Sequence, residues 1–191
     1  FMRVAMASGR RSEWASGNDM VPHELFPEIQ RSFGIGWWSL NLVFYGEPEL
    51  NRARANVVKN AFAAHTGATF RETTWHKGDA RPSLPAYGVP VSFPLRIGNW
   101  MAANGGHLGF SPVLPPERAA IEAQVTRSAE MFRRANFDFY CNITLGERHV
   151  TVVNMLAYDR GDAVMTARAD TLFRELEIGR ASCRERVSYI V

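Results

Sequence analysis

The chain has 191 residues, a formal net charge of +3 and a composition that is 46% hydrophobic and 12% aromatic. A chain of this length can form one domain and bury about 70% of its unfolded surface. The small net charge argues against a nucleic-acid or anionic-membrane partner, and no apolar run approaches the roughly 20 residues that span a bilayer.

Cysteine and histidine spacing argue against a disulfide framework and against a metal site. Before the last segment of the chain, Cys141 is the only cysteine, and it is predicted to be a small buried hydrophobe. The five histidines are scattered, with no second histidine or cysteine at ligand spacing.

The two ends of the chain differ from its middle. It begins at Phe1 without a signal-peptide pattern, so we expect it to start within a longer protein. The expected location is the cytoplasm, and a signal peptide at the true N-terminus of that longer protein stays an open alternative. Residues 177–191 resemble a sequencing adapter read through in frame, and we expect them to be non-native.

The first half of the chain predicts one strand–helix–strand unit after an irregular start. Residues 1–33 are predicted to be a connecting arm with a short amphipathic turn at about 24–31. Residues 36–45, apolar at nearly every position, predict a strand with both faces covered. A helix is predicted over 48–64, with Pro48 in its first turn and Gly67 as its C-cap, followed by a strand over 68–74. The buried stripe of that helix is predicted to be Leu50, Ala53, Val57, Ala61 and Ala64.

The second half predicts alternating strands and helices that end in a hairpin. A surface loop over 76–87 is predicted to lead into a strand or extended piece at about 91–97 and a strand at 106–113. A helix over 116–135 that stops at Asn136 is predicted to follow. A hairpin turning at 146–148 joins strands over 138–145 and 149–157, and a last helix covers 162–176. The buried stripes of the two helices are predicted to be Ile121, Val125, Ala129 and Phe132, and Met165, Ala169, Leu172 and Leu176. This order predicts an α+β fold, with a mainly antiparallel sheet and helices packed on one face.

One short motif presents a histidine. In the stretch NGGHLGFSP, from Asn104 to Pro112, His107 follows two glycines at the head of a strand. Glycines allow a close backbone approach, so a histidine held there is presented rather than packed, although Gly-Gly before a strand is also typical of an ordinary turn.

This motif resembles that of the vanillyl-alcohol oxidase and p-cresol methylhydroxylase family of flavoproteins. The resemblance extends over about residues 6–176. The further matching stretches are Gly34–Trp38 leading into Phe44–Gly46, Gly88–Pro90 before Asn99–Trp100, Asp138–Phe139, and Thr144–Gly146.

The resemblance implies that residues 34–176 are the cap, or substrate, domain of such an enzyme, with a ferredoxin-like arrangement. The implied activity is FAD-dependent oxidation of para-substituted phenols, either 4-hydroxybenzylic alcohols or 4-alkyl- and 4-allylphenols, by hydride transfer to the flavin. In the oxidases of that family the histidine at the position of His107 carries the FAD covalently, and Gly105 and Gly106 lie beside the cofactor. The implied partners are a phenolic substrate and the FAD-binding domain of the same protein. A homo-oligomer is compatible with the sequence, and the isolated chain is not expected to turn over.

Four residues are candidates for the substrate pocket. Strand alternation places Gly109 on the face of His107 and places Leu108 on the other face. Some relatives carry an aromatic residue at the position of Gly109, and the family has pocket residues at positions matching Asn142 and Val153. Structural roles are equally open for Asn142 and Val153, and Trp100 is either a pocket wall or an aromatic core residue.

Two other classes of function compete with the enzyme. An RNA-binding sheet would use exposed aromatics, but the charge is nearly balanced and the RNP signature is absent. A non-catalytic α+β binding or interaction module is the alternative to the enzyme. His107 after its two glycines distinguishes the enzyme from both alternatives, since neither alternative requires this histidine.

Overall fold

The computed structural model describes residues 5–6, 8–74, 76 and 93–182. Within these residues the sheet is built around β4 (Val150–Tyr158). β1 (Gly106–Phe110) and β2 (Val113–Leu114) follow one another along one edge of β4, and β3 (Cys141–Leu145) pairs along the other. All three pairings are antiparallel. The predicted hairpin is confirmed, and the predicted strand at 106–113 is divided into β1 and β2.

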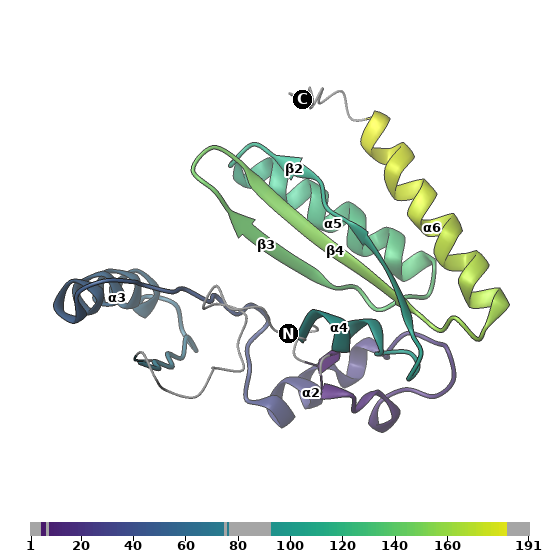
Figure 1. Ribbon diagram of the computed structural model, residues 1–191, viewed down its shortest axis with the longest axis horizontal. Coiled ribbons are helices and arrows are strands. Elements are labelled where there is room, and N and C mark those ends of the chain that lie inside the picture. The colour runs from purple at the N-terminus through teal and green to yellow at the C-terminus, as the bar shows by residue number, and fades with distance from the viewer. Residues whose placement is uncertain (1–4, 7, 75, 77–92, 183–191) are drawn as a thin grey trace.

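Two long helices cover one face of this sheet, as Figure 1 shows: α5 (Arg118–Arg134) and α6 (Ala163–Ser182). Strand alternation points Val152 and Leu156 of β4 toward them, and both side chains are buried. The α+β prediction is therefore confirmed. The predicted stripe of α6 is buried throughout, and its members are Met165, Ala169, Leu172 and Leu176.

The start and end of α5 and the start of α6 lie within two residues of the predicted boundaries. Asn136 has a φ of 56°, so the predicted left-handed stop after α5 is confirmed. In the predicted α5 stripe, Phe132 is fully buried, while Ile121 and Val125 are half-buried against Leu114 and the β4 valines. α6 continues through Ser182, beyond residue 176. Whether residues 177–191 are non-native stays a prediction.

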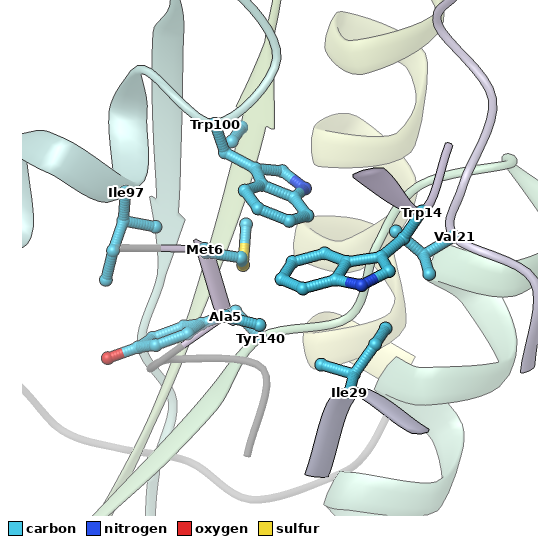
Figure 2. Close-up of a cluster of buried hydrophobic side chains, with 9 residues drawn as sticks. Ala5, Met6, Trp14, Val21, Ile29, Ile97, Trp100 and Tyr140 are labelled. Atoms are coloured by element: carbon cyan, nitrogen blue, oxygen red, sulfur yellow. The ribbon is translucent and has the colours of Figure 1, made fainter. Parts of the chain in front are cut away.

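The N-terminal segment packs on the opposite face, at one end of the sheet. It contains two short 3-10 turns, η1 (Arg11–Glu13) and η2 (His23–Leu25), and α2 (Phe26–Phe33). α4 (Phe93–Gly98) lies beside it in Figure 1. Their apolar side chains form one cluster with residues that adjoin or belong to the sheet, and Figure 2 shows the two indoles of this cluster side by side. Its buried members are Ala5, Met6, Trp14, Val21, Ile29, Ile97, Trp100, Tyr140 and Ala157.

A buried carboxylate joins this segment to the sheet. Asp138, only 7% exposed, accepts a hydrogen bond from the backbone N–H of Val21 (2.8 Å) and another from the indole Nε1 of Trp100 (2.7 Å). Burial raises the pKa of Asp138, and this outweighs the two hydrogen bonds and the Arg11 guanidinium, which lower it. Because the native state therefore binds this proton more tightly than the unfolded chain, the stability contributed by this carboxyl falls as the pH rises through its raised native pKa.

Several predictions for residues 36–74 are wrong. Residues 36–45 form no strand, and most of their large side chains are exposed; Trp38 is 67% and Tyr45 65% exposed. A strand needs a hydrogen-bonded neighbour, and no described residue provides one for this segment. Residues 68–74 are likewise not a strand.

The helix predicted after that segment is present as α3 (Pro48–Ala63), but none of its residues is buried. Figure 1 shows α3 apart from the sheet, so its predicted apolar stripe does not pack against the sheet in the part of the chain that the structure describes. Val57, in the middle of that stripe, is 70% exposed. Gly67 has a positive φ, yet it follows the end of the helix by four residues and is not its C-cap.

The prediction of a strand at 91–97 is also wrong, because 93–98 is the helix α4. Short apolar runs have no periodicity that separates a strand from a buried helix. Most of the loop predicted at 76–87 lies outside the described residues. In the described part of the chain no helix has the length and apolar character needed to cross a membrane.

We expect Asp138→Ala to lower the free energy of unfolding by roughly 2–4 kcal/mol, because it leaves the Trp100 and Val21 donors buried without an acceptor. Urea unfolding followed by circular dichroism measures this. The matched control is Asp170→Ala, which removes an exposed ion pair with Arg174 and should change stability by less than about 0.5 kcal/mol. Equal effects of the two changes would contradict the structural role of Asp138.

Candidate functional site

The face of the sheet opposite α5 and α6 carries most of the predicted site residues. In the register of β1 with β4, His107 lies opposite Ala157 and Gly109 lies opposite Met155. On the other edge, Asn142 of β3 lies opposite Val153. Residues paired in this way share a face, and side chains two positions apart along a strand share it too.

These pairings bring together four residues that are far apart in the sequence: His107, Gly109, Asn142 and Val153. From strand spacing and rise, the face between them measures roughly 10 Å across and about 13 Å along β4. His107 and Gly109 are exposed, and Asn142 and Val153 are half-buried. The neighbours Leu108 and Phe110 point to the helix side, as alternation predicts, and Ser111 lies between β1 and β2, outside the alternation.

His107 stands next to the end of α4. A Cβ atom placed on Gly98, the last residue of α4, would lie 3.2 Å from Nδ1 of His107 and 3.8 Å from its Cγ. The strand partner of His107 on β4 is the small, buried Ala157. The imidazole is therefore flanked by two residues with little or no side chain.

Three glycines around His107 differ in what they permit. A Cβ on Gly105 would lie 2.1 Å from the carbonyl oxygen of Gly98, and a Cβ on Gly106 would lie 2.5 Å from the ring of Tyr158. A Cβ on Gly109 would have no atom within 4 Å. None of the three has a positive φ, so close approach and not backbone strain explains Gly105 and Gly106.

Trp100 is buried, with 3% of its surface exposed. Its indole donates to Asp138 and lies 6.3 Å, between ring centroids, from that of Trp14. It is a buried member of the N-terminal cluster, and its role as a pocket wall stays a prediction.

The two pocket candidates on the hairpin also have structural contacts. The amide of Asn142 donates to the hydroxyl of Thr144 at 3.4 Å, and Val153 packs against the N-terminal cluster. Both are half-buried. Their role in a pocket stays a prediction.

Sequence reasoning missed three residues of this face: Gly98, Met155 and Ala157. Met155 is half-buried and is the strand partner of Gly109, so it borders the space that Gly109 leaves open. The pairing of β1 with β4 reveals Met155 and Ala157, and the packing of α4 beside His107 reveals Gly98. No local pattern in the sequence reports either contact.

Cysteine and metal chemistry find no support in this site. Cys141 faces the helix side, and burial raises the pKa of its thiol to about 11. No group of three or more potential metal ligands occurs within the described residues.

We expect Gly105→Ala to destabilise the fold by roughly 1–3 kcal/mol, because its Cβ would force two backbone segments apart. Gly109→Ala, two positions after His107 on the same strand, should lie within about 0.5 kcal/mol of wild type. Urea unfolding of both variants tests this difference. A Gly109→Ala variant as unstable as Gly105→Ala would mean that the space beside Gly109 is not open.

The sequence of this chain is similar to that of a known protein. No family model matches the chain. The chain is 24% identical over 170 residues to the "4-cresol dehydrogenase [hydroxylating] flavoprotein subunit" of Pseudomonas putida, a match that covers 87% of this chain and 32% of the relative.

Two solved structures share its fold. One is the 4-ethylphenol oxidase of Gulosibacter chungangensis in its isoeugenol complex, with a TM-score of 0.78, 21% identity, and coverage of 94% of this chain and 36% of that one. The other is p-cresol methylhydroxylase with substrate bound, with a TM-score of 0.72, 20% identity, and coverage of 92% and 35%. The chain thus spans about a third of the length of the relatives it matches. Over that segment, its predicted resemblance to the vanillyl-alcohol oxidase and p-cresol methylhydroxylase family is confirmed.

Proposed function

We propose that this chain is the substrate-domain segment of an FAD-dependent oxidoreductase that oxidises para-substituted phenols, with the flavin attached through His107. The observation that carries the proposal is the shared sheet face. His107 is exposed there beside Gly109, on the face that also holds Asn142 and Val153, while α5 and α6 cover only the other face. The match to a flavoprotein subunit supports the same role.

The residues on this face fit a covalently held flavin. In its neutral form the imidazole of His107 has a ring nitrogen with a free electron pair, which would bond to an electrophilic carbon of the cofactor. One C–H bond at that carbon and the imidazole N–H bond would break with release of two protons, and the two electrons would pass to the flavin ring, which is the oxidant of this step. The open space beside Gly109 leaves room for a flat ring next to that imidazole. When bound, the flavin would supply the hydride acceptor, and the protein would set its position and surroundings.

The rest of the face suits a small phenolic ring. Val153 and Met155 offer apolar contacts, and the Asn142 amide offers one donor and one acceptor for orientation. A mainly apolar surface with a few polar groups is typical of small-molecule sites. The domain that binds the rest of the FAD would come from the remaining two thirds of the protein, and both the 4-hydroxybenzylic alcohols and the 4-alkyl- or 4-allylphenols are candidate substrates.

One observation favours the alternative of a non-catalytic interaction module. Residues 36–45 and α3 expose large apolar side chains, among them Trp37, Trp38 and Tyr45. However, a segment about a third as long as its relatives is expected to expose surface that the remainder covers. The enzyme proposal explains both this surface and His107, so it is preferred.

Replacing His107 tests the proposal. In the full-length protein, acid-precipitated wild type should keep its yellow flavin, and His107→Ala should lose it to the supernatant. His149→Ala is the matched control, because His149 lies in the exposed β3–β4 turn, and it should keep the flavin. Flavin that washes out of the precipitated wild type would overturn covalent attachment.

Gly109 is expected to set the size of the substrate. Gly109→Phe would fill open space beside His107, and apolar pockets discriminate by about 1–3 kcal/mol per methylene-sized change. We expect kcat/KM of the full-length enzyme to fall by roughly 10-fold or more for a propyl- or allylphenol, and much less for a para-hydroxybenzyl alcohol. Steady-state kinetics on both substrates measure this. Equal losses would show that Gly109 does not border the substrate.

A further inference from the structure

Gly98 is buried at the end of α4, with its α-carbon facing the side chain of His107. A methyl group there would lie 3.2 Å from Nδ1, closer than an ordinary van der Waals contact, so the imidazole would have to move by a few tenths of an ångström. Ala157, opposite His107 on β4, is the other small neighbour of the ring.

The end of α4 is fixed in place by contacts that do not involve His107. The carbonyl of Gly98 lies against the α-carbon of Gly105, just before β1. Ile97 is 1% exposed in the N-terminal cluster, and its carbonyl accepts the backbone N–H of Trp100 at 3.1 Å. Trp100 is in turn hydrogen-bonded through its indole to Asp138. A substituent on residue 98 would therefore displace the exposed imidazole more easily than the helix.

We infer that Gly98 is a positioning residue for His107. Because Gly98 has no side chain, there is space beside it for the imidazole in its observed position. This inference rests on the proposed function, in which His107 holds the flavin. Bond formation depends steeply on the distance between reacting atoms, and a misplacement of about 1 Å can cost on the order of 100-fold in rate. Gly98→Ala should therefore slow covalent attachment by roughly 3- to 10-fold, and the bulkier Gly98→Val by more.

The test uses the full-length protein prepared without flavin and then mixed with FAD. Covalent incorporation is followed by the fluorescence of flavin that remains on the denatured protein in a gel, and the Kd of unattached FAD is measured separately. We expect Gly98→Ala to slow incorporation while the Kd stays near the wild-type value. The matched control is Gly161→Ala, whose Cβ would meet the Asp159 carboxylate at the same 3.2 Å in the turn before α6, and it should incorporate flavin at the wild-type rate.

A second measurement, the thermal unfolding of single and double variants, needs no flavin. It remains informative even if Gly98→Ala is less stable than the wild type. If the new methyl group meets the imidazole, the change in Tm caused by Gly98→Ala should be more favourable by roughly 2–4 °C in the His107→Ala background than in the wild type. Gly161→Ala should change Tm equally in the two backgrounds.

The outcomes separate the two ideas. Wild-type protein without any covalent flavin would refute the proposed function, while the thermal cycle would still report on the contact between residues 98 and 107. Wild-type protein with covalent flavin, combined with unchanged incorporation in both Gly98 variants and no thermal coupling to His107, would overturn the positioning role.

Discussion

The pairing of β1 with β4 is the contact on which the candidate site depends. A shift of this register by one residue would turn His107 toward α5 and α6 and bring Leu108 to the open face. The apolar residues of the helix side oppose such a shift, because Phe110 and Leu156 are buried against α6 and its neighbours. Burial on one face of the sheet thus determines which side chains the other face presents.

The N-terminal segment packs on the same face of the sheet as His107, at one end of that face. It packs against Tyr140 and Ala157, and Asp138 joins it to Trp100, which closes the turn after α4. The hydrogen bond between Val21 and Asp138 joins two parts of the chain that are 117 residues apart in the sequence. As a result, the position of α4 beside His107 depends on a hydrogen-bonded carboxylate as well as on apolar packing.

The sequence predicted the elements whose signals are local. The two long helices, the left-handed stop at Asn136 and the hairpin were predicted because helical spacing, a helix-ending asparagine and a short turn each act within a few residues. The strand at 36–45 was predicted from its own apolar pattern, yet a strand also needs a partner, and none of the described residues pairs with it. The alternation around His107 could be read from the strand itself. The neighbours Gly98, Met155 and Ala157 could not, because they depend on how α4 packs beside β1 and how β1 pairs with β4.

The two edges of the sheet have a consequence for work on the segment alone. Among the described residues, β3 pairs only with β4, and β1 and β2 pair only with β4, so the outer sides of both edges have free backbone donors and acceptors. Such edges are templates for pairing with other chains. Further strands could extend the sheet at these two edges. Where nothing covers them, the chain would present both edges, together with its exposed tryptophans, to its own copies, so we expect self-association at high concentration.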